Sequence, residues 1–268
     1  MEILKPEAFF NLDSYRFRDV FSGCRYVWEA LAKISAFALE QTLHSPLSSL
    51  DCFGLPLPRT VLLWQGEIRR DGFKLLGGDV AKGKFRVQID GKETSDAVVL
   101  YAGSVLMDDR IALGRGTVVE PGALIKGPTV IGEFTEVRQG AYMRGKCIVG
   151  DRCVVGHTTE MKGSIMLDDA KAGHFAYLGD SILGARANLG AGTKLANLKI
   201  GGQEVRIKVQ GEILGTGLRK FGAVLGDDVE IGCNAVTNPG TLLGKSSVVF
   251  PLASVHAGIY EPGSIVRP

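Results

Sequence analysis

The amino-acid sequence predicts a mainly β protein, in which a parallel β-helix of hexapeptide repeats follows a helical N-terminal region. Glycine supplies 36 of the 268 residues, nearly double its usual share of about 7%. From about residue 98 onward, the sequence repeats with a period of six. When it is cut from Ile111, the third position is apolar in ten successive hexads, from Leu113 to Leu167. Self-similarity at a fixed short period is the sequence signature of a solenoid.

The repeat predicts how each hexad folds. The large third residue points into a narrow prism, the small or β-branched first residue fits a corner, and glycine allows the turn. Each coil must stack on the next to bury its apolar side. The register shifts by one residue between Leu167 and Ala172, and again between Leu178 and Leu183. Residues 194–222 leave the rhythm, which predicts a protruding loop of the kind that carries function in solenoids.

The chain divides into three predicted regions. Residues 1–60 form a helical N-terminal region and linker, since Val27, Leu31, Ile34 and Ala38 are spaced as on one helix face, ending near His44. Three prolines between residues 45 and 60 then interrupt any helix. Residues 61–97 read as a lead-in of short strands, and residues 98–268 as the β-helix domain.

The composition excludes several classes of protein. A net charge of +2 is too small to predict a nucleic-acid or membrane surface. The five cysteines are scattered without a CxxC pair, which argues against a disulfide framework and a zinc site. The N-terminal "MEILKPEAFFNL" lacks the apolar segment of a signal peptide, and no apolar run is long enough to span a bilayer. We therefore expect a cytoplasmic protein with reduced thiols.

The candidate chemistry centres on His174, which lies among glycines and lysines in "MKGSIMLDDAKAGHFAYLGDS". Lys162 and Arg144 precede it by 12 and 30 residues. Both are multiples of six, so we expect the three side chains on one or equivalent faces of adjacent coils, around a single cleft. The two cations suit a phosphate. Glu160 would orient the imidazole, and His174 would then deprotonate an amine nucleophile. A surface histidine with no special role is the plain alternative.

A longer segment carries a specific resemblance. "EMKGSIMLDDAKAGHFAYLGDSILGARANLGAGT", followed by Asn197, resembles the acetyltransferase half of the bifunctional N-acetylglucosamine-1-phosphate uridyltransferase/glucosamine-1-phosphate N-acetyltransferases. The similarity runs in register from about Arg144 to Val249, with looser agreement back to about residue 98. It implies a left-handed β-helix of the hexapeptide acyltransferase superfamily, a homotrimer, and acetyl-CoA as the acyl donor. The implied role is acetylation of the amine of glucosamine 1-phosphate in UDP-N-acetylglucosamine biosynthesis.

The resemblance also implies a role for individual residues. His174 corresponds to the general base, with Glu160 near it, and acyl transfer is direct and needs no metal. The sugar-phosphate ligands correspond to Arg144, Lys162, Tyr177, Asn188 and Arg206, with Lys208 competing for the last place. Contacts to acetyl-CoA correspond to Ala191, Asn197, Cys233 (where the family usually has serine) and Arg267.

The sequence departs from the family in two places. No glycine-rich nucleotide loop precedes residue 98, so we expect no uridyltransferase activity, and a separate uridyltransferase is a candidate partner. Leu198 and Pro251 replace a tyrosine and a small residue on the acetyl-CoA side. Two other functions therefore stay open: an acyltransferase acting on another amino sugar or nucleotide sugar, and a non-catalytic sugar-phosphate binder. A γ-class carbonic anhydrase is a poor candidate, because His157 and His174 are too few to hold its metal.

Overall fold

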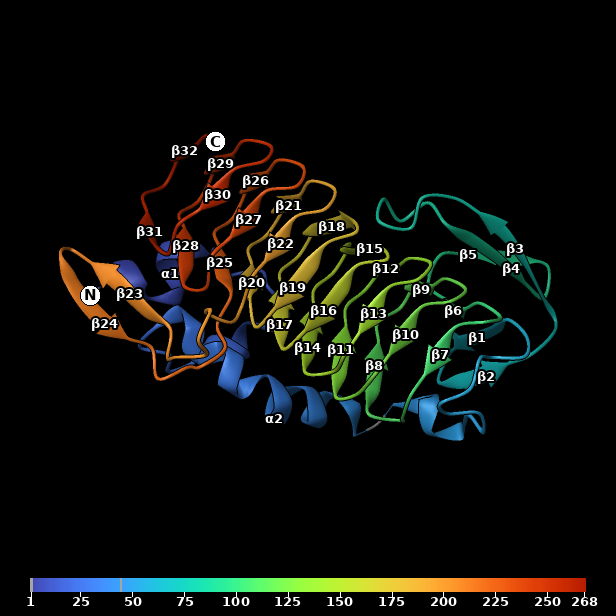
Figure 1. The fold of residues 1–268 in the computed structure, drawn as a ribbon. Helices are drawn as coiled ribbons and strands as arrows, with labels where there is room; N and C mark the ends of the chain where they lie inside the picture. Colours follow the sequence, from blue (N-terminus) through green and yellow to red (C-terminus); the bar gives the residue numbers. More distant parts are fainter. Residues whose placement is uncertain (1, 44) are drawn as a thin grey trace.

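A computed structural model describes residues 2–43 and 45–268 of the chain. Short strands recur at each turn of the chain and stack into a prism, along which the N-terminal helices run (Figure 1). The described strands of the prism form three parallel sheets, which we call faces A, B and C. The predicted parallel β-helix of hexapeptide repeats with a helical N-terminal region is confirmed.

The strands of each face pair with their counterparts in the coils above and below. Face A consists of β7 (Val105–Leu106), β10 (Leu124–Ile125), β13 (Tyr142–Met143), β16 (Glu160–Lys162), β19 (Tyr177–Gly179), β22 (Lys194–Leu195), β27 (Val236–Thr237) and β30 (Ser254–Val255). Face B consists of β6 (Val98–Leu100), β9 (Val118–Val119), β12 (Glu136–Val137), β15 (Val154–His157), β18 (Lys171–His174), β21 (Asn188–Leu189), β26 (Glu230–Ile231), β29 (Val248–Val249) and β32 (Ile265–Val266). Face C consists of β8 (Ile111–Leu113), β11 (Thr129–Ile131), β14 (Cys147–Val149), β17 (Ser164–Met166), β20 (Ile182–Leu183), β25 (Ala223–Leu225), β28 (Thr241–Leu243) and β31 (Gly258–Tyr260).

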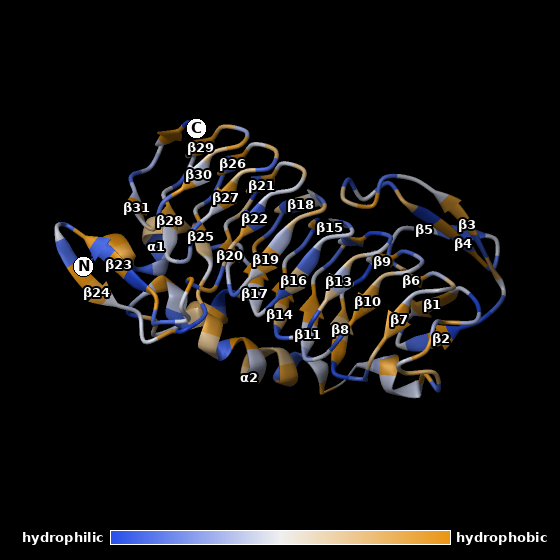
Figure 2. Ribbon diagram, viewed as in Figure 1, coloured by the Kyte–Doolittle hydropathy of each residue, from blue (hydrophilic) through white to orange (hydrophobic). Residues whose placement is uncertain are grey.

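The inward residues make one continuous core along the prism, and hydrophobic segments recur coil after coil (Figure 2). One predicted register shift was placed wrongly. Met166, between Val149 and Leu183 in the stack, lies in this core, whereas Leu167 packs with the N-terminal region. The shortened hexad therefore lies before Met166 and not after Leu167. Both residues are apolar, so the hexad pattern alone could not choose between them.

The N-terminal region covers face C. It contains η1 (Glu2–Leu4), α1 (Pro6–Phe9), η2 (Arg18–Phe21), η3 (Val27–Glu29), α2 (Ala30–Thr42) and η4 (Pro46–Ser49). Ile34 and Ala38 of α2 are buried, as the predicted stripe requires, and α2 contacts β11, β14 and β17. The predicted helix end at His44 lies outside the described residues. The outward apolar residues of face C, such as Ile148 and Ile165, are therefore buried beneath this region.

Two further elements extend from the prism. β1 (Val61–Trp64) and β2 (Glu67–Arg69) join face B in antiparallel pairing, and β3 (Phe73–Gly77), β4 (Arg86–Ile89) and β5 (Lys92–Thr94) form a separate antiparallel sheet. This sheet packs through Val87 and Ile89 against Leu62 and Val99. The segment that leaves the hexad rhythm contains the hairpin of β23 (Arg206–Val209) and β24 (Glu212–Gly215). The hairpin stands out at one end of the prism (Figure 1), with Ile207 buried against the rest of the chain. In the described part of the chain, no helix has the length and apolar character needed to cross a membrane.

Gly156 and Gly173, on neighbouring strands of face B, offer a matched test of the stacking. A methyl group on Gly156 would lie 1.8 Å from the carbonyl oxygen of Gly173, whereas one on Gly173 would meet nothing within 4 Å. We expect Gly156→Ala to lower the free energy of unfolding by about 3 kcal/mol or more, since backbone cannot yield as a side chain does. Gly173→Ala should change it by no more than about 1 kcal/mol. Urea denaturation followed by circular dichroism measures both, and equal effects would contradict the close approach.

Candidate active site

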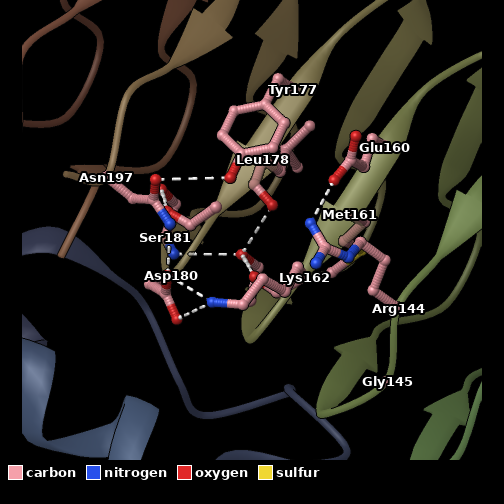
Figure 3. Close-up of polar contacts among 12 residues, drawn as sticks. Arg144, Gly145, Glu160, Met161, Lys162, Tyr177, Leu178, Asp180, Ser181 and Asn197 are labelled. Carbon is pink, nitrogen blue, oxygen red and sulfur yellow. Dashed lines mark hydrogen bonds and ion pairs between the residues drawn. The ribbon is translucent and has the colours of Figure 1, made fainter. Parts of the chain in front are cut away.

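The residues singled out from the sequence fall into two groups on different faces. Glu160, Lys162 and Tyr177 lie on β16 and β19 of face A. Arg144 directly follows β13, and Asn197 joins them from the chain after β22 (Figure 3). His174 and Asn188 lie on β18 and β21 of face B, followed by Ala191 and Cys233 in the turns of that face. Inward and outward side chains alternate along each strand, which turns Glu160 and Lys162 outward on either side of the buried Met161, and Asn188 outward before Leu189. His174 is exposed because it ends β18, where the chain turns at the corner.

Arg144 and Lys162, the two cations of the face A group, are each held in an ion pair. The guanidinium of Arg144 donates to Oε1 of Glu160 at 2.7 Å, and this hydrogen bond raises the pKa of Arg144. The ammonium of Lys162 donates to both carboxylate oxygens of Asp180, at 2.9 and 2.7 Å. Each pair joins two neighbouring coils, Arg144 to the coil of β16 and Lys162 to the coil of β19 (Figure 3). The group therefore carries the positive charges that a phosphate needs, together with carboxylates that a phosphate would have to displace or share.

Asp180 links the lysine to a hydrogen-bonded chain. The Asn197 amide donates to Asp180, and the hydroxyl of Tyr177 donates to Oδ1 of Asn197 at 3.3 Å. Burial, with smaller contributions from the carboxylates of Glu160 and Asp180, raises the pKa of Tyr177, so the phenol stays neutral and can donate. Asp180 was not among the predicted site residues, although it ends the quoted segment "YLGD". Lys162 lies 18 residues before Asp180, one full coil earlier. This spacing was the signal in the sequence that could have identified Asp180 as its partner.

The structure places Asn197 in the face A group, beside the predicted sugar-phosphate ligands, and its contact with acetyl-CoA stays a prediction. Glu160 was expected to orient His174, but its carboxylate binds Arg144. Among residues 2–43 and 45–268, no hydrogen bond reaches the imidazole of His174, so the expected carboxylate–imidazole contact is not formed.

His174 lies at the end of β18, next to the corner between faces B and A. It pairs in register with His157 of the preceding coil. The Nδ1 atom of His157 lies 3.0 Å from the carbonyl oxygen of Gln139. Phe175 occupies the corner itself and contacts both histidine rings, with centroid distances of 5.3 Å to His157 and 6.3 Å to His174. His174 is exposed to solvent and open to a ligand.

A broad, open hollow of about 1210 Å³ lies on face B. Part of its wall comes from the segment after β3, through Gly78, Asp79 and Lys82. The predicted site residues that line it are His174, Asn188, Ala191 and Cys233. Arg144, Lys162 and Tyr177 are not among its lining residues. The prediction of one cleft that joins His174 to both cations is therefore wrong for a single chain.

The remaining predicted ligands lie apart from the face A group. Arg206 begins β23 on the hairpin, which packs against β31 of face C, and its Nε lies 3.9 Å from Glu204. Arg267 follows β32, at the end of face B, with its guanidinium 5.0 Å from the ring centre of Phe250. Neither contact defines a ligand site.

Comparisons with known proteins support the resemblance to the bifunctional acetyltransferases that the sequence motifs indicated. Residues 125–216 match the family model described as the GMPPB C-terminal domain. Over 96 residues the chain is 35% identical to a bifunctional sugar-1-phosphate nucleotidylyltransferase/acetyltransferase of Sulfurisphaera tokodaii, which covers 36% of this chain and 24% of that protein. The resemblance to these bifunctional proteins is confirmed.

Other relatives carry the name bifunctional protein GlmU. The one from Methanococcus maripaludis strain C7 is 37% identical over 86 residues, which is 32% of this chain and 21% of that protein. The one from Stutzerimonas stutzeri is 32% identical over 186 residues, 65% of this chain and 36% of that protein. This chain thus spans between 21% and 36% of the length of these relatives. Among solved structures, a UDP-N-acetylglucosamine acyltransferase of Francisella novicida aligns with a TM-score of 0.40 at 13% identity, over 59% of this chain and 58% of that one.

The cysteines provide a chemical check of the site. Cys233 is exposed in the hollow, whereas Cys147 and Cys153 are buried, and burial raises the pKa of Cys147 to about 12. We expect iodoacetamide at pH 8 to label Cys233 in the folded protein, and Cys147 and Cys153 only after unfolding, as mass spectrometry of peptides would show. Saturating acetyl-CoA should slow the labelling of Cys233. Unchanged labelling would remove Cys233 from the predicted coenzyme contacts.

Proposed function

We propose that this protein transfers an acetyl group from acetyl-CoA to the amine of glucosamine 1-phosphate. The observation that carries the proposal is the hollow of face B, in which His174 lies beside Asn188, Ala191 and Cys233. These are the positions that match the base and ligands of the acetyltransferases it resembles. The β-helix of residues 98–268 would carry the chemistry, in the cytoplasm, beside a separate uridyltransferase. Residues 1–60 and 61–97 would cover face C and supply part of the wall of the hollow.

The proposed reaction is a direct transfer. The amine nitrogen attacks the thioester carbonyl carbon while His174 accepts a proton from that nitrogen. The tetrahedral intermediate then collapses with cleavage of the carbon–sulfur bond, and the departing thiolate of coenzyme A takes up a proton. No covalent enzyme intermediate and no metal are needed, because the acceptor is itself the nucleophile.

The backbone amide of Ala191 is the best-placed hydrogen-bond donor for the oxyanion that develops in the tetrahedral intermediate. The backbone amides of Gly190, Gly192 and Thr193 donate to Ile231, His174 and Gly190 within the stack of coils. Among the described residues, no backbone acceptor takes the amide of Ala191, which lines the hollow beside His174. A single donor of this kind contributes about 2.7–4 kcal/mol to acyl-transfer transition states.

The division of the site between two faces supports a homotrimer. Adjacent faces of a triangular prism point in different directions, so a ligand of sugar-phosphate size seated deep on one face does not reach the other. The N-terminal region packs over face C and the β3–β5 sheet over the first strands of face B, while Arg144, Lys162, Tyr177 and His174 are exposed or half-exposed. A closed threefold assembly would set face A of one chain against face B of the next and bring Arg144, Lys162 and Tyr177 to the partner's base.

Replacing the base tests the reaction itself. We expect His174→Ala to lower kcat/KM by about 10²–10⁴, measured as coenzyme A release with glucosamine 1-phosphate and acetyl-CoA. His256→Ala, at an exposed histidine outside both groups, should leave it within about twofold. Unchanged turnover in His174→Ala would contradict the role of His174 as the general base. No turnover in the unmodified protein, with calorimetric binding of the sugar phosphate, would favour the non-catalytic binder, and faster turnover with a nucleotide-linked amino sugar would favour the second acyltransferase.

Mixing two inactive variants tests whether the site lies between chains. His174→Ala damages only face B, and Lys162→Ala only face A, so each pure trimer has no intact site. After random co-assembly, about three quarters of the trimers contain both variants, and each of these has one intact junction. We therefore expect about a quarter of the unmodified activity to return. Mixtures that stay inactive would contradict a site shared in this way.

A further inference from the structure

Phe175 adopts a backbone conformation that its side chain disfavours. Its φ angle is +52°, in the left-handed region, where a bulky residue is a genuine outlier. In the other coils, the same corner position is held by Gly122, Gly140, Thr158, Gly192, Asn234 and Leu252, so one other bulky residue adopts this conformation there. Glycine and asparagine tolerate this conformation best. The chain thus carries an aromatic ring at a corner where a smaller residue would fit with less strain.

The Phe175 ring gains little stability from burial to offset the cost of this backbone conformation. Phe175 is 56% exposed, so packing does not account for a phenylalanine there. Its ring contacts are with histidines: the His157 ring meets it edge-on, at an interplanar angle of 77°, and the His174 ring is tilted to it by 41°. The contact of His157 Nδ1 with the Gln139 carbonyl holds that imidazole in place. His157 therefore braces the Phe175 ring beside the proposed base.

The position of the ring suggests what it serves. Phe175 stands between His174 on face B and Tyr177 on face A, at the edge where the two groups of site residues come nearest in sequence. Leu252 and Phe134 share this positive φ, so the strain alone does not single out Phe175, whereas an exposed aromatic ring 6.3 Å from the ring of the proposed base does. A pyranose ring carries C–H groups on its faces and packs on aromatic rings, as apolar walls commonly orient a ligand for a few polar groups.

The geometry points to Phe175 as a substrate-contact residue whose ring packs against the sugar of the acceptor and holds its amine at His174. This inference rests on the proposed function, since it names the acceptor's sugar ring as the ligand. His157 acts on the substrate only through Phe175 and is a positioning residue.

The test compares two phenylalanines in the same backbone conformation. Phe134 also has a φ of +52°, but it lies at the corner between faces C and B, with the Arg115 guanidinium 5.2 Å from its ring centre. Phe175→Asn should raise KM for glucosamine 1-phosphate about tenfold, with KM for acetyl-CoA within about twofold. Phe134→Asn should leave both KM values within about twofold. Phe175→Tyr, which keeps the ring, should restore the acceptor KM, and thermal unfolding should show all three variants folded.

The outcomes separate this inference from the proposed function. If the unmodified protein does not acetylate the amine, the proposed function fails, and the sugar contact fails with it. If the unmodified protein is active but Phe175→Asn keeps its acceptor KM, only the contact is overturned. Equal effects of Phe175→Asn and Phe134→Asn, or a rise confined to KM for acetyl-CoA, would also overturn it. Should Phe175→Asn not fold, Phe175→Leu gives the same comparison, because it removes the ring but keeps an apolar side chain.

Discussion

The pairing of each coil's backbone with the next is the constraint on which the rest of the molecule depends. Tyr142, Glu160 and Tyr177 are aligned on face A, and His157 and His174 on face B, because parallel strands pair them directly. Strands so paired lie about 4.8 Å apart, so side chains at the same position of successive coils stack on one another, and the inward ones form the apolar core. The polar side chains of the site therefore lie at outward positions and at corners. On each face, the outward side chains of successive coils are aligned in rows.

The same constraint explains what the sequence could predict. A period of six identifies inward positions, and it predicted the prism, its core and the outward direction of the site residues. It does not identify the face, because a full coil contains three hexads. Arg144 and Lys162 are 18 residues apart, a whole coil, and share face A, whereas His174 follows Lys162 by 12 residues and so falls on another face. The error lay in treating every multiple of six as one direction. The ion pairs of Arg144 and Lys162 depend on side-chain conformations that no spacing reveals.

The N-terminal region limits which assemblies the prism can form. Face C carries outward apolar residues, among them Ile148 and Ile165, that would otherwise be exposed, and the N-terminal segments bury them together with Phe10 and Trp28. The carboxylate of Asp227 holds the N-terminal region to the prism. It accepts hydrogen bonds from the backbone amides of Asn11 and Ala185, at 2.7 and 2.8 Å. Faces A and B hold the two groups of site residues, and in the proposed trimer they would meet ligands and other copies of the chain.

The two ion pairs of face A differ in how readily a phosphate could replace them. The Arg144 and Glu160 side chains are 43% and 35% exposed, and a pair in such contact with water contributes little to stability. Lys162 and Asp180 are 25% and 19% exposed, and Asp180 is also held through Asn197 to Tyr177. In the proposed reaction, a dianionic phosphate would therefore exchange with Glu160 at Arg144, where a guanidinium offers two parallel hydrogen bonds, while Lys162 stays fixed by Asp180. That exchange would free the Glu160 carboxylate from its ion pair with Arg144.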